Sequence, residues 1–362
     1  MLEVAADLPG LASEWDDLAD RVDAVPFLRP GWFEAWWAAF GTGELELVAL
    51  RRGEQLVAVL PLTRWRGGFR SPTNDHTPRF GPLVKDREAA SDLARALLAR
   101  KPRALRMEYI DSSSTGVSEL RDQARKANYR LLEREWERPP YVAIDGTWEE
   151  YQRALEGKIR RDLARRRRRL ADEGRVELDI RNGVDHLPEL LNEGWALEPS
   201  GWKSREGTAV RSRPETQAFY TALADWAARR GILRLSFLRV GSRSVAFQYG
   251  LEDAGVYYFL KGGYDQGFRS FAPGKLLVQA LLERAFEENL TRFEFLGADD
   301  RFKLDWTSTR HNLTLFEAFA PSAAGLLGWA TEAYGRPTAK KAAAGARSLA
   351  RRRSAATPGR ES

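Results

Sequence analysis

Residues 266–275, Gln-Gly-Phe-Arg-Ser-Phe-Ala-Pro-Gly-Lys, are the segment of this chain whose residue types could do chemistry. A glycine-bearing turn leads directly into a predicted helix, so free backbone N–H groups would point outward at the positive end of the helix dipole. Such a helix start is a natural seat for phosphate. Arg269 and Lys275 would add two full positive charges beside it. An ordinary strand-to-helix connection is the alternative, because short loop patterns are weak without context.

The elements that must position this loop can be inferred from the spacing of the apolar residues. Residues 235–240, 244–251 and 256–260 are apolar or alternating runs next to turn residues, which predicts three successive strands. Between residues 274 and 289 the apolar positions recur at roughly helical spacing. Residues 290–296 return to strand composition. The pattern therefore predicts a hairpin, a third strand, the loop, a helix and a further strand.

One hairpin pattern occurs twice in the chain. Residues 50–58 and 238–246 share Leu, Arg, Gly, Val and Ala at identical relative positions. Each copy follows helical sequence that is rich in aromatic residues, at 32–40 and at 219–226. The length of 362 residues fits two domains of the usual size, about 100–200 residues each. We therefore predict two related domains.

The loop residues 269–274 resemble the pyrophosphate loop of the GNAT acyltransferases, which place Arg or Gln, two residues, Gly, one residue, and Gly or Ala between a strand and a helix. Ala272 stands where that family has its first glycine, and Pro273 lacks a backbone N–H. The resemblance implies acetyl-CoA or another acyl-CoA as co-substrate. The residues that it assigns to the cofactor are Arg269, Ser270, Phe271, Ala272, Gly274 and Lys275.

Most of the chain is similar to the CelD-like proteins, which have tandem GNAT-like domains and are distantly related to the Fem peptidyltransferases. The runs that carry this resemblance are 201–207, 264–277, 293–297 and the pair Phe302 and Lys303. It implies an α/β fold with two domains, each a mixed, mostly antiparallel sheet flanked by helices. The expected divisions are residues 1–145 without a donor loop, 146–320 with the acyltransferase site, and 321–362 as a terminal helix and basic, flexible tail.

The implied reaction transfers an acyl group from acyl-CoA to an amine. Because the thioester is already activated, the enzyme must position the amine, remove its proton, stabilise the oxyanion with a backbone N–H and protonate the leaving thiolate. In GNAT proteins two strands splay apart to admit the pantetheine arm, here residues 256–261 and 291–296. Near that opening, Glu294 or Asp299 is the expected base and Tyr264 the expected acid. A purely structural role is the alternative for each.

The acceptor is expected to be an amine on a small molecule, with amino sugars and cell-envelope or polysaccharide precursors foremost. Trp202, Lys203 and Arg205 lie in a glycine-flanked loop that the resemblance places near the acceptor, where they could grip a sugar or peptide. Lys303 could balance an acidic group on acceptor or donor; a surface ion pair is the alternative. Two other functions stay open: Fem-like aminoacyl transfer from tRNA, and a non-catalytic binding module.

Positive charge is concentrated in two clusters. Residues 336–362 hold eight basic residues, one acidic residue and almost no large apolar ones, which predicts a solvated tail that could touch nucleic acid or anionic lipid nonspecifically. Residues 158–169 hold eight basic residues and one acidic one, on a predicted surface helix. This helix could bind the 3′-phosphate of coenzyme A, a phosphorylated acceptor or tRNA. Alternatively, its long side chains only shield the sheet.

Composition excludes several kinds of site. The chain has no cysteine, and therefore no disulfide, thiolate nucleophile or Cys-ligated zinc. His76, His186 and His311 show no metal-ligand spacing, so we expect surface or packing roles for them and no metal site. No run approaches the roughly 18–20 apolar residues that cross a bilayer, and the acidic N-terminus does not resemble a signal peptide. We therefore expect a cytoplasmic protein.

Overall fold

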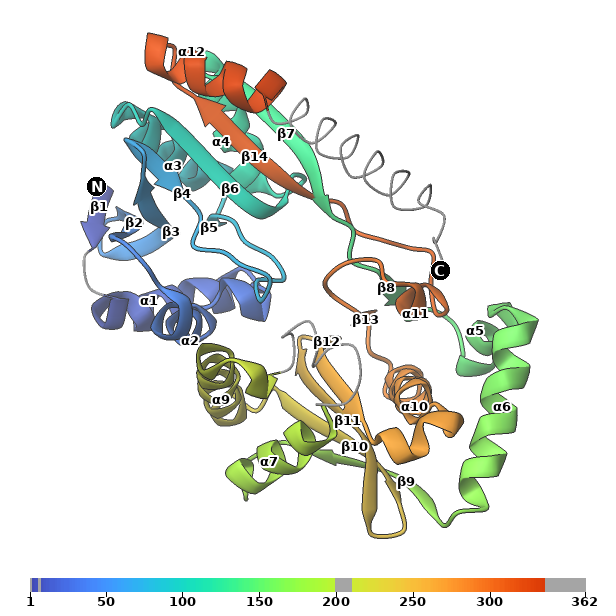
Figure 1. Cartoon of the computed structure of the whole chain (residues 1–362). Coiled ribbons are helices and arrows are strands. Elements are labelled where there is room, and N and C mark those ends of the chain that lie inside the picture. Colours follow the sequence, from blue (N-terminus) through green and yellow to red (C-terminus); the bar gives the residue numbers. More distant parts are fainter. Residues whose placement is uncertain (1, 6–7, 199–209, 336–362) are drawn as a thin grey trace, which may run out of the picture.

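The computed structural model describes residues 2–5, 8–198 and 210–335. Two mixed sheets, each flanked by helices, account for these residues, and this confirms the predicted α/β architecture. Figure 1 shows the sheets as two separate units, one built mainly from the blue-to-teal part of the chain and the other from the green-to-orange part. Among the described residues, no helix is long and apolar enough to span a bilayer.

The first unit contains an eight-stranded sheet of order β1-β2-β3-β4-β6-β14-β7, with β5 paired to β3. Its strands are β1 (Leu2–Ala5), β2 (Leu45–Arg52), β3 (Gln55–Trp65), β4 (Gly68–Arg70), β5 (Leu83–Val84), β6 (Ala104–Asp111), β7 (Arg130–Glu137) and β14 (Leu313–Phe319). Its helices are α1 (Leu8–Arg21), α2 (Pro30–Phe40), α3 (Arg87–Ala99), α4 (Thr115–Lys126) and α12 (Ala323–Ala330). Buried residues of α1 and α2 pack on one face, and those of α3 and α4 pack on the other.

The second unit contains a six-stranded sheet of order β8-β13-β12-β11-β10-β9. Its strands are β8 (Tyr141–Ala143), β9 (Val176–Arg181), β10 (Leu233–Val240), β11 (Arg243–Asp253), β12 (Val256–Tyr264) and β13 (Arg292–Glu294). Its helices are α5 (Trp148–Ala154), α6 (Gly157–Ala171), α7 (Leu187–Leu197), α9 (Pro214–Arg229), α10 (Pro273–Glu287) and α11 (Arg301–Leu304). One face carries α7 and α9 together with α2 of the first unit, and the other carries α5, α6 and α10.

The hairpin repeat is confirmed by the strand register. Leu50 pairs with Ala58 between β2 and β3, and Leu238 pairs with Ala246 between β10 and β11. In both hairpins a β-bulge follows this pair directly. Both turns contain a glycine with positive φ, a conformation that glycine adopts without steric cost. The shared residues therefore encode the same bulged hairpin twice.

The repeat extends to an ion pair that joins each hairpin to a helix of its own unit. Arg51 forms two hydrogen bonds to the carboxylate of Glu14 in α1. Arg239, at the equivalent position, donates to the two carboxylate oxygens of Glu193 in α7 at 2.7 and 3.3 Å. A guanidinium fork matches a carboxylate in this bidentate way. The same side-chain pairing thus fixes one helix over one sheet face in both units.

The two units exchange strands. β14 follows α11 in the chain but inserts between β6 and β7 of the first sheet, antiparallel to both (Figure 1). β8 follows β7 but pairs with β13 of the second sheet. The expected divisions at residues 145 and 320 therefore do not coincide with the division between the sheets. Strand composition does not specify which sheet a strand joins, because that depends on contacts distant in sequence.

Candidate active site

The predicted strand, turn and helix are present around residues 265–275, called the donor turn below. β12 leads through the short 3₁₀ helix η3 (Gln266–Phe271) into α10. The carboxylate of Asp265 accepts the N–H of Gly267 at 2.8 Å and so fixes the start of η3. Ala272 is left-handed, with φ 50° and ψ 53°. The chain thus keeps a glycine-like conformation at the position where the GNAT pattern has glycine.

The first turn of α10 offers few backbone donors. Pro273 has no N–H, and the N–H groups of Lys275 and Leu276 both donate to the Ala272 carbonyl oxygen, at 3.0 and 3.2 Å. Within this described turn, the N–H of Gly274 is the donor left for a ligand. An anion bound here therefore has to rely on basic side chains as well as on the helix dipole.

Basic side chains surround the donor turn. Arg166 of α6 donates to the carbonyl oxygen of Ser270 at 2.5 Å, and the guanidinium of Arg169 lies 5.2 Å from the ring centroid of Phe271. The arginine-rich helix therefore packs against the turn. The basic residues on the turn or in contact with it are Arg166, Arg169, Arg243, Arg269 and Lys275. Lys275 also forms a 2.5 Å ion pair with Asp305.

The equivalent helix of the first unit, α3, is capped by a carboxylate instead. The carboxylate of Asp86 accepts the N–H of Ala89 at 2.8 Å and caps the helix. Glu88 follows in the first turn. Negative charge at a helix start is stabilised by the dipole but repels a phosphate. The single donor site, in the second unit, stays a prediction.

The strands β12 and β13 pair only briefly. Their parallel ladder consists of Val256 with Arg292, Tyr257 with Phe293, and Tyr258 with Glu294. β12 then continues to Tyr264, whereas the Phe295 N–H donates to the Pro140 carbonyl oxygen and Leu296 takes a left-handed φ of 54°. On this side, the edge of β12 from residue 259 to 264 therefore has no strand beside it among the described residues.

A β-bulge lies in the same part of β12. Tyr249 of β11 pairs with Lys261 and Gly250 pairs with Phe259, so Leu260 has no opposite residue. A bulge leaves its extra residue unpaired and redirects nearby side chains. Lys261 turns toward α9, where its ammonium lies 5.5 Å from the ring centroid of Tyr220. The bulge thus supplies irregular backbone where β12 leaves β13.

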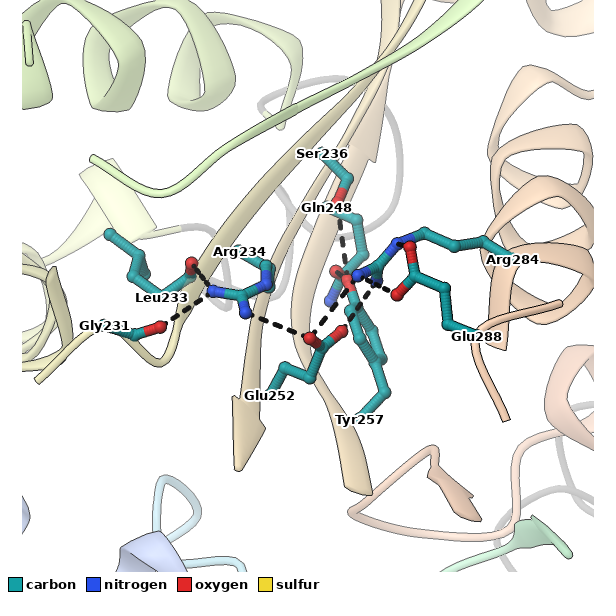
Figure 2. Close-up of polar contacts among 9 residues, drawn as sticks. All are labelled: Gly231, Leu233, Arg234, Ser236, Gln248, Glu252, Tyr257, Arg284 and Glu288. Atoms are coloured by element: carbon teal, nitrogen blue, oxygen red, sulfur yellow. Dashed lines mark hydrogen bonds and ion pairs between the residues drawn. The ribbon is translucent and has the colours of Figure 1, made fainter. Parts of the chain in front are cut away.

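A polar network fixes α10, and with it the donor turn, to the sheet (Figure 2). Glu252 of β11 accepts from Arg284 of α10 at 2.6 Å and from Arg234 of β10 at 3.0 Å. Arg284 also donates to Glu288 at 2.9 Å. Burial alone would raise the pKa of Glu252, but the hydrogen bonds and charges of Arg284 and Arg234 outweigh it and hold this pKa below its usual value. The carboxylate therefore stays charged.

Uncharged buried groups continue this network under the helix. Tyr257 donates a hydrogen bond to Gln248, and Ser236 lies within 3.5 Å of the Tyr257 hydroxyl (Figure 2). Gly250 makes room for this arrangement, because a Cβ there would lie 2.6 Å from the Tyr257 oxygen. Burial raises the pKa of Tyr257, so its hydroxyl stays protonated and available as a donor.

Glu294 lies in an ion-paired cluster at the junction of the units. His311 Nε2 is 2.9 and 3.0 Å from its two carboxylate oxygens, and Arg292 approaches to 3.4 Å. The His311 ring stacks on Tyr141 at 4.3 Å. Only 3% of Glu294 is exposed. These contacts suit a residue that joins β13 to the linker leading into β14, and its role as the base stays a prediction.

The other predicted site residues lie around the donor turn and the loop after β13. Tyr264 ends β12 next to Gly274, where a Cβ would be 3.6 Å from its ring. Asp299 forms a 3.1 Å ion pair with Arg310. Lys303 Nζ donates to the carbonyl oxygens of Leu296 and Ala298 at 2.8 and 2.7 Å, and thereby closes this loop. Trp202, Lys203 and Arg205 lie outside the described residues, as does the tail 336–362.

The structure brings one carboxyl group of the first unit to this loop. Burial raises the pKa of Glu137, at the end of β7; Lys303 lowers it, and the charges of Asp75 and Asp300 raise it further. The net pKa is above that of an ordinary glutamate. The sequence holds no signal for Glu137, because this residue lies in a run of alternating charged residues with no motif around it.

His76 of the first unit packs against the second. Its ring stacks on Phe40 at 5.2 Å, and its Nδ1 lies 3.3 Å from the Tyr220 hydroxyl. Burial, together with the charges of Lys261 and Arg213, lowers the pKa of His76 to about 4. His76 is therefore neutral near pH 7, and its contacts agree with the predicted packing role.

Comparison with known proteins adds a domain assignment to this geometry. Residues 157–304 match the acetyltransferase (GNAT) domain. The matched segment begins with α6 and ends with α11, and so includes the donor turn. The part of the chain that is similar to this domain thus lies in the second unit. No curated protein matches the chain.

Solved structures share the fold over most of the chain. FemX aligns with a TM-score of 0.54 at 12% identity, over 88% of this chain and 96% of its own. The C-terminal domain of a putative lysylphosphatidylglycerol synthetase from Agrobacterium fabrum aligns with a TM-score of 0.52 at 12% identity, over 89% and 95%. A conserved protein of unknown function from Bacteroides thetaiotaomicron aligns with a TM-score of 0.53 at 11% identity, over 88% of this chain and 100% of its own. At these identities the likeness concerns the fold.

Proposed function

We propose that the chain is an N-acyltransferase that moves an acyl group, acetyl in the simplest case, from coenzyme A to an amine. One observation carries this proposal: the basic donor turn follows directly on the part of β12 whose edge toward β13 has no strand beside it in the described part of the chain. A pyrophosphate bound at the turn would direct the pantetheine arm along this free edge. The thioester would then lie near the bulge at Leu260.

Different residues of the donor turn would have different parts in binding acyl-CoA. The Gly274 N–H and the side chains of Arg269 and Lys275 would hold the pyrophosphate, because charge-assisted hydrogen bonds are the strong ones. Ser270, Phe271 and Ala272 would shape the turn around it. The bulge at Leu260 would offer a backbone N–H for the oxyanion.

The chemical step needs a base and an acid. The amine nitrogen attacks the thioester carbon, forms the C–N bond and loses a proton to the base; the C–S bond then breaks, and the thiolate takes a proton from the acid. Tyr264 is the candidate acid, by its position next to Gly274. Glu294, Asp299 and Glu137 are the candidate bases. We favour Glu137, because its charge interactions with Lys303 and Asp300 bring it to the loop after β13 and its raised pKa favours proton acceptance.

The acceptor in this proposal is an amino sugar or another amine of a cell-envelope or polysaccharide precursor. Its support is the resemblance to CelD-like proteins through the runs 264–277 and 293–297. Trp202, Lys203, Arg205 and Lys303 remain the proposed acceptor contacts. Lys303 would act indirectly, since its ammonium closes the loop after β13.

Isothermal titration calorimetry with acetyl-CoA tests the proposal. The wild type should bind, and Arg269→Glu plus Lys275→Glu should weaken binding at least 100-fold, because each hydrogen bond to a charged group contributes about 1.5–3 kcal/mol. The matched control is Lys85→Glu plus Arg87→Glu, the same charge change at the start of α3, which should bind normally. A folded wild type that does not bind acetyl-CoA would refute the proposal.

Aminoacyl transfer from tRNA is the second candidate, and α6 is the observation that favours it. Arg160, Arg161 and Arg168 on this helix are exposed and could contact a nucleic-acid backbone. The salt dependence of ligand binding distinguishes the two functions. Binding of tRNA should weaken 10³-fold or more between about 50 and 200 mM salt if six or more phosphates are contacted, whereas binding of one coenzyme A should weaken far less.

A further inference from the structure

A cavity of about 310 Å³ lies in the first unit, apart from the donor turn. It is bounded by the end of α2, the ends of β3 and β4 with the segment that follows, and β6. Its volume falls within the range of small-molecule sites, about 300–1,000 Å³. Every lining residue belongs to the first unit. The cavity is therefore a candidate site separate from the donor turn.

Aromatic rings form one wall of the cavity. Trp36, Trp37 and Phe40 come from α2, and Trp65 from the end of β3. Trp36 and Phe40 have ring centroids 5.7 Å apart, and Trp37 and Trp65 are partly exposed. Indole rings are large, rigid apolar surfaces. They suit a ligand with a flat face of C–H groups.

The opposite wall is polar and held in place by hydrogen bonds. Arg106 donates to Glu108 at 2.8 Å and to Glu317 at 2.6 Å. Thr73 donates to the other oxygen of Glu108 at 3.3 Å. A carboxylate has about four acceptor sites, and three donor atoms (Nε and Nη2 of Arg106 and Oγ1 of Thr73) reach Glu108. Glu108 therefore retains acceptor capacity for a ligand.

Asn74 supplies a complementary donor. Its Oδ1 accepts from Trp36 Nε1 at 3.0 Å and from the backbone N–H of His76 at 2.9 Å. Two donors on the same atom fix the orientation of the amide, which leaves the Nδ2 hydrogens to donate. The exposed guanidinium of Arg70 adds donors at the rim.

We propose that this cavity binds a saccharide ring. A pyranose has C–H faces that pack on indole rings and a rim of hydroxyl groups that both donate and accept. An apolar ligand would cover the remaining acceptor sites of Glu108 and the Nδ2 hydrogens of Asn74 without satisfying them, at about 1–3 kcal/mol for each buried polar group. A phosphate would meet the carboxylate of Glu108. A sugar ring can pack on the aromatic wall and form hydrogen bonds with the polar wall.

Contacts lead from the cavity toward β12. Phe40 lines the cavity and stacks on His76, and the His76 ring contacts Tyr220 of the second unit. The ring of Tyr220 in turn contacts the ammonium of Lys261 beside the bulge of β12. If the proposed acyl transfer holds, on which this step rests, the bound sugar is part of the acceptor.

Saturation-transfer difference NMR on the full chain tests the site. The probes are glucose, glucosamine and N-acetylglucosamine at millimolar concentration, with the acyclic polyol mannitol as the probe that has no ring face. At least one of the three sugars should receive saturation at its ring C–H protons, and mannitol should not. Trp65→Ala should reduce the signal at least fivefold, and Trp65→Phe, which keeps a ring, should restore most of it.

Trp136→Ala is the matched control, since Trp136 is 39% exposed and lies outside the cavity; it should leave the signal unchanged. Absence of transfer to all three sugars, equal transfer to mannitol, or a Trp65→Ala signal equal to that of the wild type would overturn the proposal. Acetyl-CoA binding is measured separately by calorimetry. Its loss with sugar binding intact would therefore refute the acyl-CoA donor and leave the saccharide site standing.

Discussion

The guanidinium of Arg166 donates a 2.5 Å hydrogen bond to the carbonyl oxygen of Ser270. This contact fastens the arginine-rich helix α6 to the donor turn, 104 residues away in sequence. Arg165 shares the carboxylate of Asp162 with Arg166, and Arg169 covers the ring of Phe271. We therefore expect Arg165 and Arg169 to contact the adenosine 3′-phosphate of a coenzyme A whose pyrophosphate occupies the turn.

Arg165→Gln plus Arg169→Gln should weaken acetyl-CoA binding about 10–100-fold, because one or two charge-assisted contacts to the 3′-phosphate are lost. Binding of the dephospho form of acetyl-CoA should change less than about twofold. Calorimetry with both ligands measures the difference. Arg160→Gln plus Arg167→Gln is the control, since these exposed residues lie about 140–180° around the helix from Arg165 and Arg169. Equal losses for both ligands would contradict this role.

Ala272→Gly should stabilise the protein. The left-handed conformation of Ala272 costs an L-residue about 1–2 kcal/mol, part of which the greater freedom of glycine in the unfolded chain offsets. The expected gain is about 0.5–1 kcal/mol, measured by urea unfolding. Ala280→Gly, in the interior of α10, the helix that Ala272 precedes, should instead destabilise the protein by about 0.5–1 kcal/mol. A destabilised Ala272→Gly variant would disprove the backbone conformation at the donor turn.

Glu137→Gln should lower kcat about 10²–10⁴-fold, the usual contribution of a general base. The wild-type rate should fall as the pH drops through the pKa of Glu137, since a protonated carboxyl cannot accept the proton of the amine. Because this pKa is raised, the fall should come above the value of about 4.3 for an ordinary glutamate. Glu135→Gln, an exposed neighbour on the same strand, should keep both rate and profile. An unchanged profile in Glu137→Gln would return the role to Glu294 or Asp299.

Glu252→Gln should destabilise the protein by about 2–3 kcal/mol at pH 7, because the carboxylate holds Arg284 and Arg234 in a largely buried network. The folded-state pKa of Glu252 is lowered, so its stabilisation is present above the unfolded-state pKa of about 4.3 and is lost as the pH falls through the folded-state value. The difference between wild type and variant should therefore shrink in acid. Urea unfolding at pH 7 and pH 3 measures it. Glu288→Gln, on the exposed side of Arg284, should cost at most about 1 kcal/mol.

Local sequence patterns were sufficient to predict those structural elements whose conformation depends on residues close by in the chain. The hairpins at residues 50–58 and 238–246 form because a turn glycine and alternating apolar residues define them locally. The turn into α10 follows for the same reason, since Pro273 and Gly274 set where the helix begins. The weak set of backbone donors there could also be predicted, because a proline removes an N–H wherever it folds.

Long-range contacts decided the rest. Residues 313–319 form a strand that is buried on both faces, and such a strand could belong to either sheet. Its place in the first sheet depends on partners about 200 residues away in sequence. In the same way, Glu294 is an isolated acid in sequence and becomes the partner of His311 only through this strand exchange. The raised pKa of Glu137 and the proposed saccharide cavity likewise arise only where segments distant in sequence meet. Burial and hydrogen-bond partners fix the chemical character of a side chain, and the folded path of the chain determines both.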